Sequence, residues 1–314
     1  MDRPQHVLFA FVGEFTHLAF SNAIEPLRLA NRLTERDLYT WTFASRDGAP
    51  VVASNGARMM VDTCYADLPK FDLLFLITGN DVREHIDRQL LAFLRKARVS
   101  GAQMATFCSG AFAFAAAGFL DDQDAALHWE FHVPFREAYP KVHLASGVYV
   151  RDGTVMTAAG GHASADLVLE LLRREHGQEL ATSVSDQMLY NSVRTEASLQ
   201  RISIQARYGV RSDKLARAIS AIEEKPDEIK SVAEICQYAG ISSRQLERLF
   251  KRYLNTTPKK HLLGVRLAKA RQLLQQTEMS VTEITLACGF ENTSHFARLY
   301  RQAFGIAPRE QRAM

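Results

Sequence analysis

Short, mainly apolar runs recur through the first half of the chain, and the first of them, residues 7–12, is unbroken. They cover residues 7–12, 41–44, 73–78, 104–108 and 154–159. Runs of this length are typical of strands that are buried on both faces of a sheet. We therefore expect a sheet at the centre of the domain, with other elements covering both of its faces.

Between these runs, apolar residues recur at helical spacing. The first such stretch carries Phe20, Ile24 and Leu27 on one face, and Pro26 lies within it, so we expect that helix to kink or restart there. Further helical stretches span residues 83–99, 109–120 and 163–175. Strands that alternate with helices predict an α/β domain over residues 1–190, with an open, mostly parallel sheet and helices on both faces.

The pattern changes toward the C-terminus. Residues 191–210 are polar and only partly helical in pattern, which is typical of a linker. From residue 211 to residue 314 the pattern is helical, with no strand candidate. The sequence thus predicts a second, all-α domain over residues 211–314.

An internal repeat occupies this second domain. Residues 231–240 and 280–289 both start with Ser-Val-x-Glu-Ile and end with Gly, and they lie 49 residues apart. Ser-x-x-Glu is a capping box, which satisfies the exposed amides at a helix start. The Gly can take the left-handed conformation that links one helix to the next.

A second helix follows in each copy of the repeat, with apolar residues at i, i+3 and i+4 on one face. These residues are Leu246, Leu249 and Phe250 in the first copy, and Phe296, Leu299 and Tyr300 in the second. The order helix, turn, packed second helix is the helix-turn-helix layout, whose second helix enters the major groove of DNA. A plain helical bundle with a charged outer face is the alternative interpretation.

The side chains that point away from the apolar face are suited to DNA. Arg can bond guanine, Glu can accept from cytosine, and Ser, Thr and His are short partners for base edges. The predicted base-contacting residues are Arg244, Gln245, Glu247, Arg248, Thr293, Ser294, His295 and Arg298. The residues predicted to lie along the phosphates are Lys251, Arg252, Lys259, Lys260 and Arg301. Two such units in tandem favour double-stranded promoter DNA as a partner over the plain bundle.

Charge supports a difference between the two domains. Apolar residues make up 47% of the 314-residue chain and charged residues 23%, which is enough for two cores and argues against disorder. From residue 211 onward there are 18 Lys and Arg against 11 Asp and Glu, a net of +7, whereas the rest carries 20 against 24, a net of −4. A basic tail on an acidic body indicates a polyanionic partner for the tail alone.

Other compositional signals exclude several classes of protein. No apolar run reaches the roughly 18 residues of a membrane helix, and the N-terminus lacks the layout of a signal peptide, so we expect a cytoplasmic protein with no membrane partner. The four cysteines, Cys64, Cys108, Cys236 and Cys288, are scattered and form no CxxC pair. We therefore expect no disulfide framework, no metal site and no cofactor.

Residues 211–314 resemble the DNA-binding domain of the AraC/XylS family. The resemblance is carried by Ala-Lys-Ala-Arg-Gln-Leu-Leu at 268–274, Ile284, Ala-Cys-Gly-Phe at 287–290, Ser-His-Phe at 294–296, Phe304-Gly305 and Pro308. It implies seven helices, with two recognition helices joined by one long helix, here about residues 259–275. It also implies contacts with successive major-groove segments on one face of the duplex.

The other informative segment is Met-Ala-Thr-Phe-Cys-Ser-Gly-Ala at residues 104–111. A strand that runs into a helix through a small-residue turn resembles a nucleophile elbow, which holds a Cys or Ser at the end of the strand. The nearby helix start is expected to lower the pKa of the Cys108 thiol. A cysteine hydrolase with a DNA-binding tail is therefore one hypothesis.

The region around Cys108 resembles the class I glutamine amidotransferase-like fold of the PfpI type, a flavodoxin-like α/β fold. The matching pieces are Gly79, Cys108, residues 126–129, Tyr139-Pro140, Asp152-Gly153, residues 157–160 and Asp166-Leu167. Catalytic members need a base, often a His directly after the Cys, and an acidic residue from the first helix. Here Ser109 follows Cys108, and the acidic position, near Ala19 or Phe20, is apolar. His128 is a candidate remote base without an obvious orienting carboxylate.

These departures favour ligand sensing over catalysis, and we assign no catalytic residue. Together with the AraC-type domain, the architecture resembles regulators that respond to small nitrogenous metabolites such as amino acids or quaternary amines. In an open α/β sheet the ligand site lies outside the carboxyl ends of the strands. The predicted ligand-binding residues are Gly79, Asn80, Cys108, Ser109, His128 and Trp129. Core packing of Trp129 and a structural, half-buried His128 are the alternatives.

Three hypotheses thus describe the whole chain: a ligand-responsive regulator, a cysteine hydrolase with a DNA-binding tail, and an architectural DNA binder that no effector controls. The two resemblances together favour the first. It has promoter DNA, a small-molecule effector, RNA polymerase and a second copy of the chain, in a homodimer, as expected partners. The sequence specifies neither the effector nor whether promoters are activated or repressed.

Overall fold

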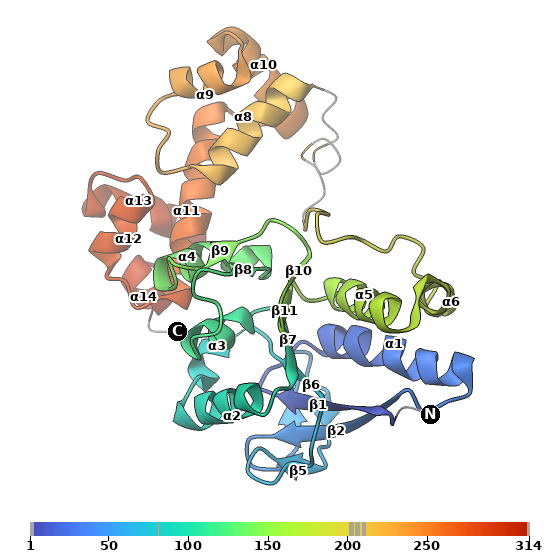
Figure 1. Cartoon of the computed structure of the whole chain (residues 1–314). Coiled ribbons are helices and arrows are strands. Elements are labelled where there is room, and N and C mark those ends of the chain that lie inside the picture. Colours follow the sequence, from blue (N-terminus) through green and yellow to red (C-terminus); the bar gives the residue numbers. More distant parts are fainter. Residues whose placement is uncertain (1–2, 81, 201–203, 205–207, 209–211, 313–314) are drawn as a thin grey trace. The chain divides into compact units, whose positions relative to one another are not determined.

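The computed structural model describes residues 3–80, 82–200, 204, 208 and 212–312, and it divides into two compact units, Met1–Gln200 and Arg201–Met314 (Figure 1). The predicted linker, residues 191–210, lies partly outside the described residues. Its first part is anchored to the first unit, because the Arg194 guanidinium bonds the buried Asp166 carboxylate at 2.8 Å.

The first unit is built on a seven-stranded sheet in the order β10-β11-β7-β6-β1-β2-β5. The strands are β1 (Gln5–Phe11), β2 (Tyr39–Ser45), β5 (Thr63–Cys64), β6 (Leu73–Ile77), β7 (Gln103–Phe107), β10 (Tyr149–Asp152) and β11 (Val155–Ala158). All neighbouring strands pair in parallel except β10 and β11, which are antiparallel. The predicted mostly parallel α/β sheet is confirmed.

Helices cover both faces of this sheet (Figure 1). α1 (His17–Thr34), α5 (Ala163–His176) and α6 (Gln178–Gln187) lie on one face, and α2 (Arg88–Val99) and α3 (Ala111–Ala116) lie on the other. Side chains alternate along β1, so that Phe9 joins the core under α1 and α5 while Leu8 joins the core under α2 and α3. A continuously apolar strand is explained by burial on both faces.

Shorter elements complete the first unit. They are β3 (Val51–Val52), β4 (Arg58–Met59), β8 (Asp124–Ala125), β9 (His143–Leu144), α4 (His132–Ala138) and two short 3-10 helices, η1 (Val82–His85) and η2 (Trp129–Phe131). Both 3-10 helices follow segments that carry predicted ligand residues.

Three helix predictions in this unit need correction. α1 continues through Pro26 as one helix, so of the two predicted outcomes, a kink or a restart, the restart is wrong, and Pro26 is buried where α1 packs against the core. The predicted helix 83–99 is divided into η1 and α2, because Asp87 leaves the helical conformation and accepts a hydrogen bond from the Leu90 amide as the N-cap of α2. The helix predicted over residues 109–120 is shorter, and it ends at Ala116.

Within the described residues 212–312, the second unit contains seven helices. They are α8 (Asp213–Glu224), α9 (Val232–Ala239), α10 (Ser243–Leu254), α11 (Pro258–Gln276), α12 (Val281–Ala287), α13 (Thr293–Phe304) and α14 (Pro308–Arg312). α8, α9 and α10 share one core, to which Ile219, Ile235 and Phe250 contribute. α11 is the long connecting helix that the sequence predicts, and its 19 residues span about 28 Å.

Among the described residues, no helix combines the length and the apolar character that a membrane crossing requires. The same residues contain no cluster of three or more His, Cys, Asp or Glu side chains arranged to hold a metal ion.

Candidate functional site

The two predicted recognition helices each bury one face and expose the other. α10 buries Leu246 and Phe250, and α13 buries Phe296 and Tyr300. Of the predicted DNA-contacting residues, those that are exposed are Arg244, Gln245, Glu247, Arg248, Lys251, Arg252, Lys259, Lys260, Ser294, His295, Arg298 and Arg301. Thr293 is half-buried. The charged face therefore points to solvent in both units, where base edges and phosphates can reach it.

Capping side chains fix where the first helix of each unit begins. Ser280 and Glu283 form the predicted box at α12, with the Ser280 amide donating to Glu283 at 2.6 Å and the Glu283 amide donating to Ser280 at 3.2 Å. At α9 the Ser231 hydroxyl accepts from the Glu234 amide at 3.3 Å, but the Glu234 carboxylate accepts from the Lys230 amide at 3.0 Å. The box predicted at α9 is therefore incomplete.

A capping box that the sequence reading missed starts the first recognition helix. The Ser242 amide donates to the Gln245 side chain, and the Gln245 amide donates to the Ser242 hydroxyl, both at 3.3 Å. Gln245 is thus engaged at the start of α10, in addition to being exposed on its outer face. Ser-x-x-Gln at residues 242–245 was the available signal.

Arg266 of α11 joins the connecting helix to the loop between α8 and α9. Its Nε donates to the Pro226 carbonyl at 2.8 Å and its Nη2 to the Ile229 carbonyl at 2.7 Å. One turn further along, the Lys269 ammonium pairs with Asp227 at 2.8 Å. We call these contacts of Arg266 and Lys269 with residues 226–229 the α11 clamp.

The turn of the second helix-turn-helix unit packs on the same loop, residues 226–229. Gly289 has a φ of +74°, and a Cβ there would lie 2.8 Å from the Asp227 Cα. The Arg266 guanidinium lies 5.8 Å from the centre of the Phe290 ring. The α11 clamp therefore connects the first helix-turn-helix unit, the connecting helix and the turn of the second helix-turn-helix unit, all within residues 212–312.

In the first domain, Cys108 occupies a strained turn between β7 and α3. Its φ of +61° lies in the left-handed region, which is unusual for a residue with a side chain. Its amide donates to the Ala158 carbonyl at the end of β11, at 3.0 Å. Gly160 faces it closely, because a Cβ at Gly160 would lie 2.8 Å from the Cβ of Cys108. The predicted elbow geometry is present.

The thiol on this elbow is shielded from solvent. Cys108 is 7% exposed, and the Thr16 hydroxyl donates to its sulfur at 3.8 Å. Burial raises the pKa of the Cys108 thiol, and the lowering effects of the Thr16 hydroxyl and the Ser109 amide do not offset it. The expectation that the helix start lowers this pKa is wrong, because desolvation outweighs the contribution of the six-residue α3. A protonated thiol is a poor nucleophile.

His128 lies against the elbow through its backbone, since its amide donates to the Cys108 carbonyl at 3.3 Å. Its Nδ1 is buried and 3.9 Å from the Glu130 carboxylate, which is too far for a hydrogen bond. Burial lowers the pKa of the His128 imidazole more than Glu130 raises it. The sequence reading missed Glu130, which η2 brings back toward His128. Trp129 is 41% exposed, so it is not a core residue.

The remaining predicted ligand residues divide into buried and exposed ones. Ser109 is fully buried, and its hydroxyl donates to the Gly79 carbonyl. A Cβ at Gly79 would lie 1.8 Å from the Glu14 carbonyl oxygen, so only Gly allows the loops after β1 and β6 to approach this closely. Asn80 is exposed. At the expected acidic position of the first helix, Ala19 and Phe20 are buried and apolar.

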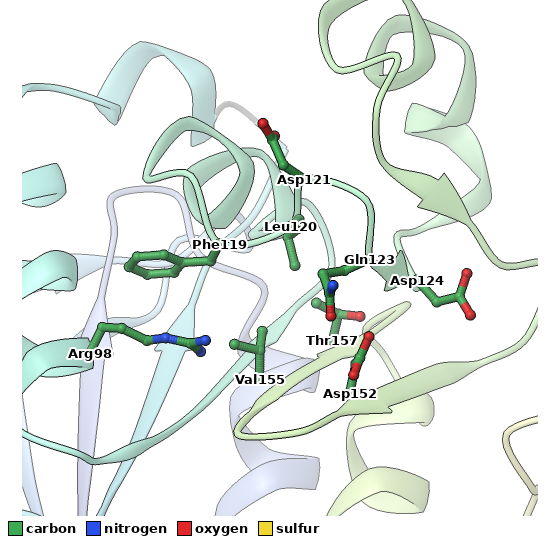
Figure 2. A pocket seen from close by; sticks show the side chains of 9 residues that line it. All are labelled: Arg98, Phe119, Leu120, Asp121, Gln123, Asp124, Asp152, Val155 and Thr157. Carbon is green, nitrogen blue, oxygen red and sulfur yellow. The ribbon is translucent and has the colours of Figure 1, made fainter.

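The cavities of the first unit include two that border the sheet. The first has a volume of about 230 Å³ and lies near the start of β11, where the Arg98 guanidinium stands 5.5 Å from the centre of the Phe119 ring (Figure 2). Its acidic members are Asp121, Asp124 and Asp152. The second has a volume of about 270 Å³ and lies at the ends of β1 and β2. None of the six predicted ligand residues lines either cavity.

Comparison with known families divides the chain in the same way as the structure. Residues 15–174 match the DJ-1/PfpI family, and residues 235–314 match a helix-turn-helix domain.

Curated relatives match over nearly the whole chain. The HTH-type transcriptional regulator CdhR of Pseudomonas aeruginosa is 40% identical over 310 residues, which cover 99% of this chain and 92% of the relative. GbdR of the same species, also an HTH-type transcriptional regulator, is 37% identical over 309 residues, which cover 98% and 84%. The HTH-type transcriptional regulator GlxA of Rhizobium meliloti is 30% identical over 305 residues, which cover 97% and 94%.

Solved structures match the first unit. The crystal structure of an AraC family transcriptional regulator from Pseudomonas putida is 26% identical, has a TM-score of 0.53, and covers 59% of this chain and 100% of its own. DJ-1beta of Drosophila melanogaster has a TM-score of 0.52 at 18% identity, covers 60% of this chain and 100% of its own, and shares the fold.

Proposed function

The chain belongs to the AraC-type helix-turn-helix transcription regulators that carry a DJ-1/PfpI domain, and we propose that a small nitrogenous metabolite controls its binding to promoter DNA. Residues 1–190 are the sensor in this proposal, residues 191–210 the linker and residues 211–314 the DNA-binding domain. The protein acts in the cytoplasm, where its promoters are.

The observation that carries the DNA part of the proposal is the exposure of Arg244, Arg248 and Arg298 on helices whose opposite faces are buried. An arginine on an exposed recognition helix can bond guanine through two acceptors in the major groove. The other predicted contact residues lie beside these arginines on α10 and α13, apart from Lys259 and Lys260, which lie at the start of α11. Two recognition helices in one chain can contact two successive major-groove segments.

We assign the first domain a sensing role and no catalysis. The raised pKa of the Cys108 thiol and the apolar residues at the expected acidic position support this assignment. Gly79, Asn80, Cys108, Ser109, His128 and Trp129 form the proposed elbow site for the effector. An amino acid or a quaternary amine is the proposed class of effector.

Effector and DNA then influence each other's affinity by the same factor, because the coupling free energy is reciprocal. A homodimer would place two DNA-binding domains on one promoter. RNA polymerase would be the partner whose recruitment or exclusion the protein controls. Sedimentation of the full chain at several concentrations tests the dimer.

Selection of bound sequences from random duplexes by the full chain tests the DNA part. We expect an enriched site with two conserved elements about one helical turn apart, protected in a footprint at moderate salt. Equal retention of enriched and shuffled duplexes would contradict the proposal.

A Cys108→Ser variant separates sensing from catalysis. We expect the variant to keep a metabolite-dependent change in the footprint. If instead the wild type hydrolyses amides and this turnover disappears in the variant, the first domain is an enzyme.

A further inference from the structure

A cleft at the carboxyl edge of the sheet lies apart from the Cys108 elbow. It has a volume of about 270 Å³, and its walls come from the end of β1, the loop after β2, Tyr65 after β5 and the start of α2. Val12 and Gly13 contribute from the first of these, Arg46 and Asp47 from the second, and His85 and Asp87 from the segment that leads into α2. The elbow, in contrast, stands at the ends of β7 and β11, on the far side of β6.

The topology of the sheet indicates that the cleft is at a position where ligands commonly bind. From β1 the chain proceeds to β2 on one side, and it later returns to β6 on the other side of β1. After β1 the chain enters α1 on one face of the sheet, whereas after β6 it enters α2 on the other face, and the strand order reverses at β1. In open α/β sheets ligands bind in the crevice outside the carboxyl ends of the strands at such a switch point. The cleft of Figure 2 lies near the start of β11 and does not meet this condition.

The guanidinium of Arg46 is held in place at the rim of the cleft. Its Nη2 pairs with Asp87, and its Nε donates to the Gln89 side chain at 2.9 Å. Asp87 is itself fixed as the N-cap of α2, where it accepts from the Leu90 amide at 2.9 Å. The side chain that would recognise an anionic group is thus oriented before any ligand arrives, which reduces the entropic cost of binding.

A carboxylate and an imidazole complete the polar part of the cleft. One oxygen of Asp47 accepts from the Ala49 amide at 3.0 Å, which orients the carboxylate. The His85 ring lies against Gly13, where a Cβ would be 2.9 Å from the ring. Among the described residues, no group hydrogen-bonds the His85 ring, so it can donate to or accept from a ligand.

The remaining wall is apolar and preformed. Val12 and Tyr65 are buried, and the Tyr65 ring stacks on Phe93 with centroids 4.4 Å apart. The Tyr65 hydroxyl donates to the Phe11 carbonyl at 2.6 Å, so it is already satisfied. A small cleft with apolar walls and a few oriented polar groups is the usual form of a metabolite site.

We infer that this cleft is a second ligand site that takes a small zwitterion of the amino-acid type. The carboxylate of the ligand bonds Arg46 and His85, its cationic nitrogen faces Asp47, and its short carbon skeleton lies against Val12. The volume limits the ligand to a small metabolite. This inference rests on the proposed sensing function, and it names a site for the effector class that lies outside the elbow.

The test uses the full chain and a readout local to the cleft. The ring resonance of His85, assigned by its loss in His85→Gln, is followed in NMR spectra of histidine-labelled protein. The probes are the common L-amino acids and glycine betaine, which carry both charges, with choline as a cation alone and propionate as an anion alone. We expect at least one zwitterion to shift this resonance saturably, and choline and propionate to bind about tenfold more weakly or less.

Substitutions then assign the contacts. Arg46→Gln and Asp47→Asn should each weaken the zwitterion's effect on His85 by about tenfold. Arg58→Gln, an exposed arginine on β4 that does not line the cleft, should leave it unchanged. Cys108→Ala should leave it unchanged as well, because the elbow lies on the far side of β6. A retained melting temperature without ligand shows that each variant is folded.

Two results would overturn the inference and leave the proposed function standing. In one, a zwitterion binds the chain by calorimetry and alters the footprint without moving the His85 resonance. In the other, the resonance moves equally in wild type, Arg46→Gln and Asp47→Asn. If no probe moves the resonance, the inference also fails, while the selection and footprint experiments still judge DNA recognition separately.

Discussion

The two helix-turn-helix units share a sequence pattern and differ in what surrounds their turns. Gly240 ends α9 with a φ of +63°, and a Cβ added there would meet nothing within 4 Å. Gly289 follows α12 with a φ of +74°, and a Cβ there would meet the backbone of Asp227 at 2.8 Å. The first turn is open to solvent, and the second is packed on the α11 clamp.

This difference shows two separate reasons for a glycine at one position of a repeat. In the first unit only the left-handed conformation requires it, which costs another residue roughly 1–2 kcal/mol. In the second unit the close approach of another backbone requires it as well. The two turns are therefore alike in sequence, but only the second also positions one helix-turn-helix unit against the other.

The largest effect is expected from replacing these glycines by alanine. Gly289→Ala should destabilise the second helix-turn-helix unit by about 3 kcal/mol or more, because the strain of the left-handed conformation adds to a backbone clash. Gly240→Ala should cost about 1 kcal/mol. Hydrogen exchange of the α9 and α12 amides in the full chain measures the two units separately. Equal loss of protection in both variants would contradict the comparison.

Local features of this domain were open to prediction from sequence, and the clamp was not. Helical periodicity, the two Ser-x-x-Glu starts and the glycines depend on neighbouring residues, so they can be read along the chain. Arg266 bonds carbonyls 37 and 40 residues away, and nothing in the pattern around it indicates those partners.

The first domain gives the same lesson. The sheet and the elbow follow from strand runs and a small-residue turn, and both are found. The pKa of the Cys108 thiol depends on burial by the loops after β1 and β11, so the local argument gave the wrong direction. The interruption at Asp87 and the continuity through Pro26 are decided by capping and by packing on the core. The cleft collects residues from four separate segments and has no motif.

A second test compares how the two units read DNA. Arg244→Ala in the first unit and Arg298→Ala in the second should each cost about 1–3 kcal/mol in binding to the selected site and relax the preference at one base pair. Competition titrations with single-base variants of that site measure both effects.

Lys251→Ala is the matched control for these arginines. As a predicted phosphate contact, it should weaken binding to selected and shuffled duplexes alike and make the salt dependence shallower. If Arg244→Ala or Arg298→Ala also weakens both duplexes equally, that arginine does not read bases.

A smaller effect is expected at the caps of the first helices. Ser280→Ala removes one member of a complete capping box, and Ser231→Ala removes a hydroxyl that accepts from the Glu234 amide and donates to the Glu234 carboxylate outside such a box. Each should cost about 1 kcal/mol, with the larger loss at α12, because the two reciprocal bonds of a complete box hold each other in place, so that losing the Ser280 hydroxyl also loosens the bond from the Ser280 amide to Glu283. Exchange rates of the first-turn amides of α9 and α12 report the difference. A larger loss at α9 would show that the incomplete box is the stronger cap.

The smallest effect concerns acid pH and the carboxylate of the same box. Hydrogen bonds from the side chain and amide of Ser280 hold the pKa of Glu283 below its ordinary value. A group whose pKa is lowered by folding stabilises the fold above its unfolded pKa and loses that contribution as the pH falls through the folded one. We therefore expect wild type to protect the α12 amides slightly better than Glu283→Gln near neutral pH, and this advantage to vanish at acid pH. An NMR titration should place the Glu283 midpoint below that of a model peptide and should move it upward in Ser280→Ala. A midpoint equal to that of the peptide would show that the box leaves the carboxylate unaffected in solution.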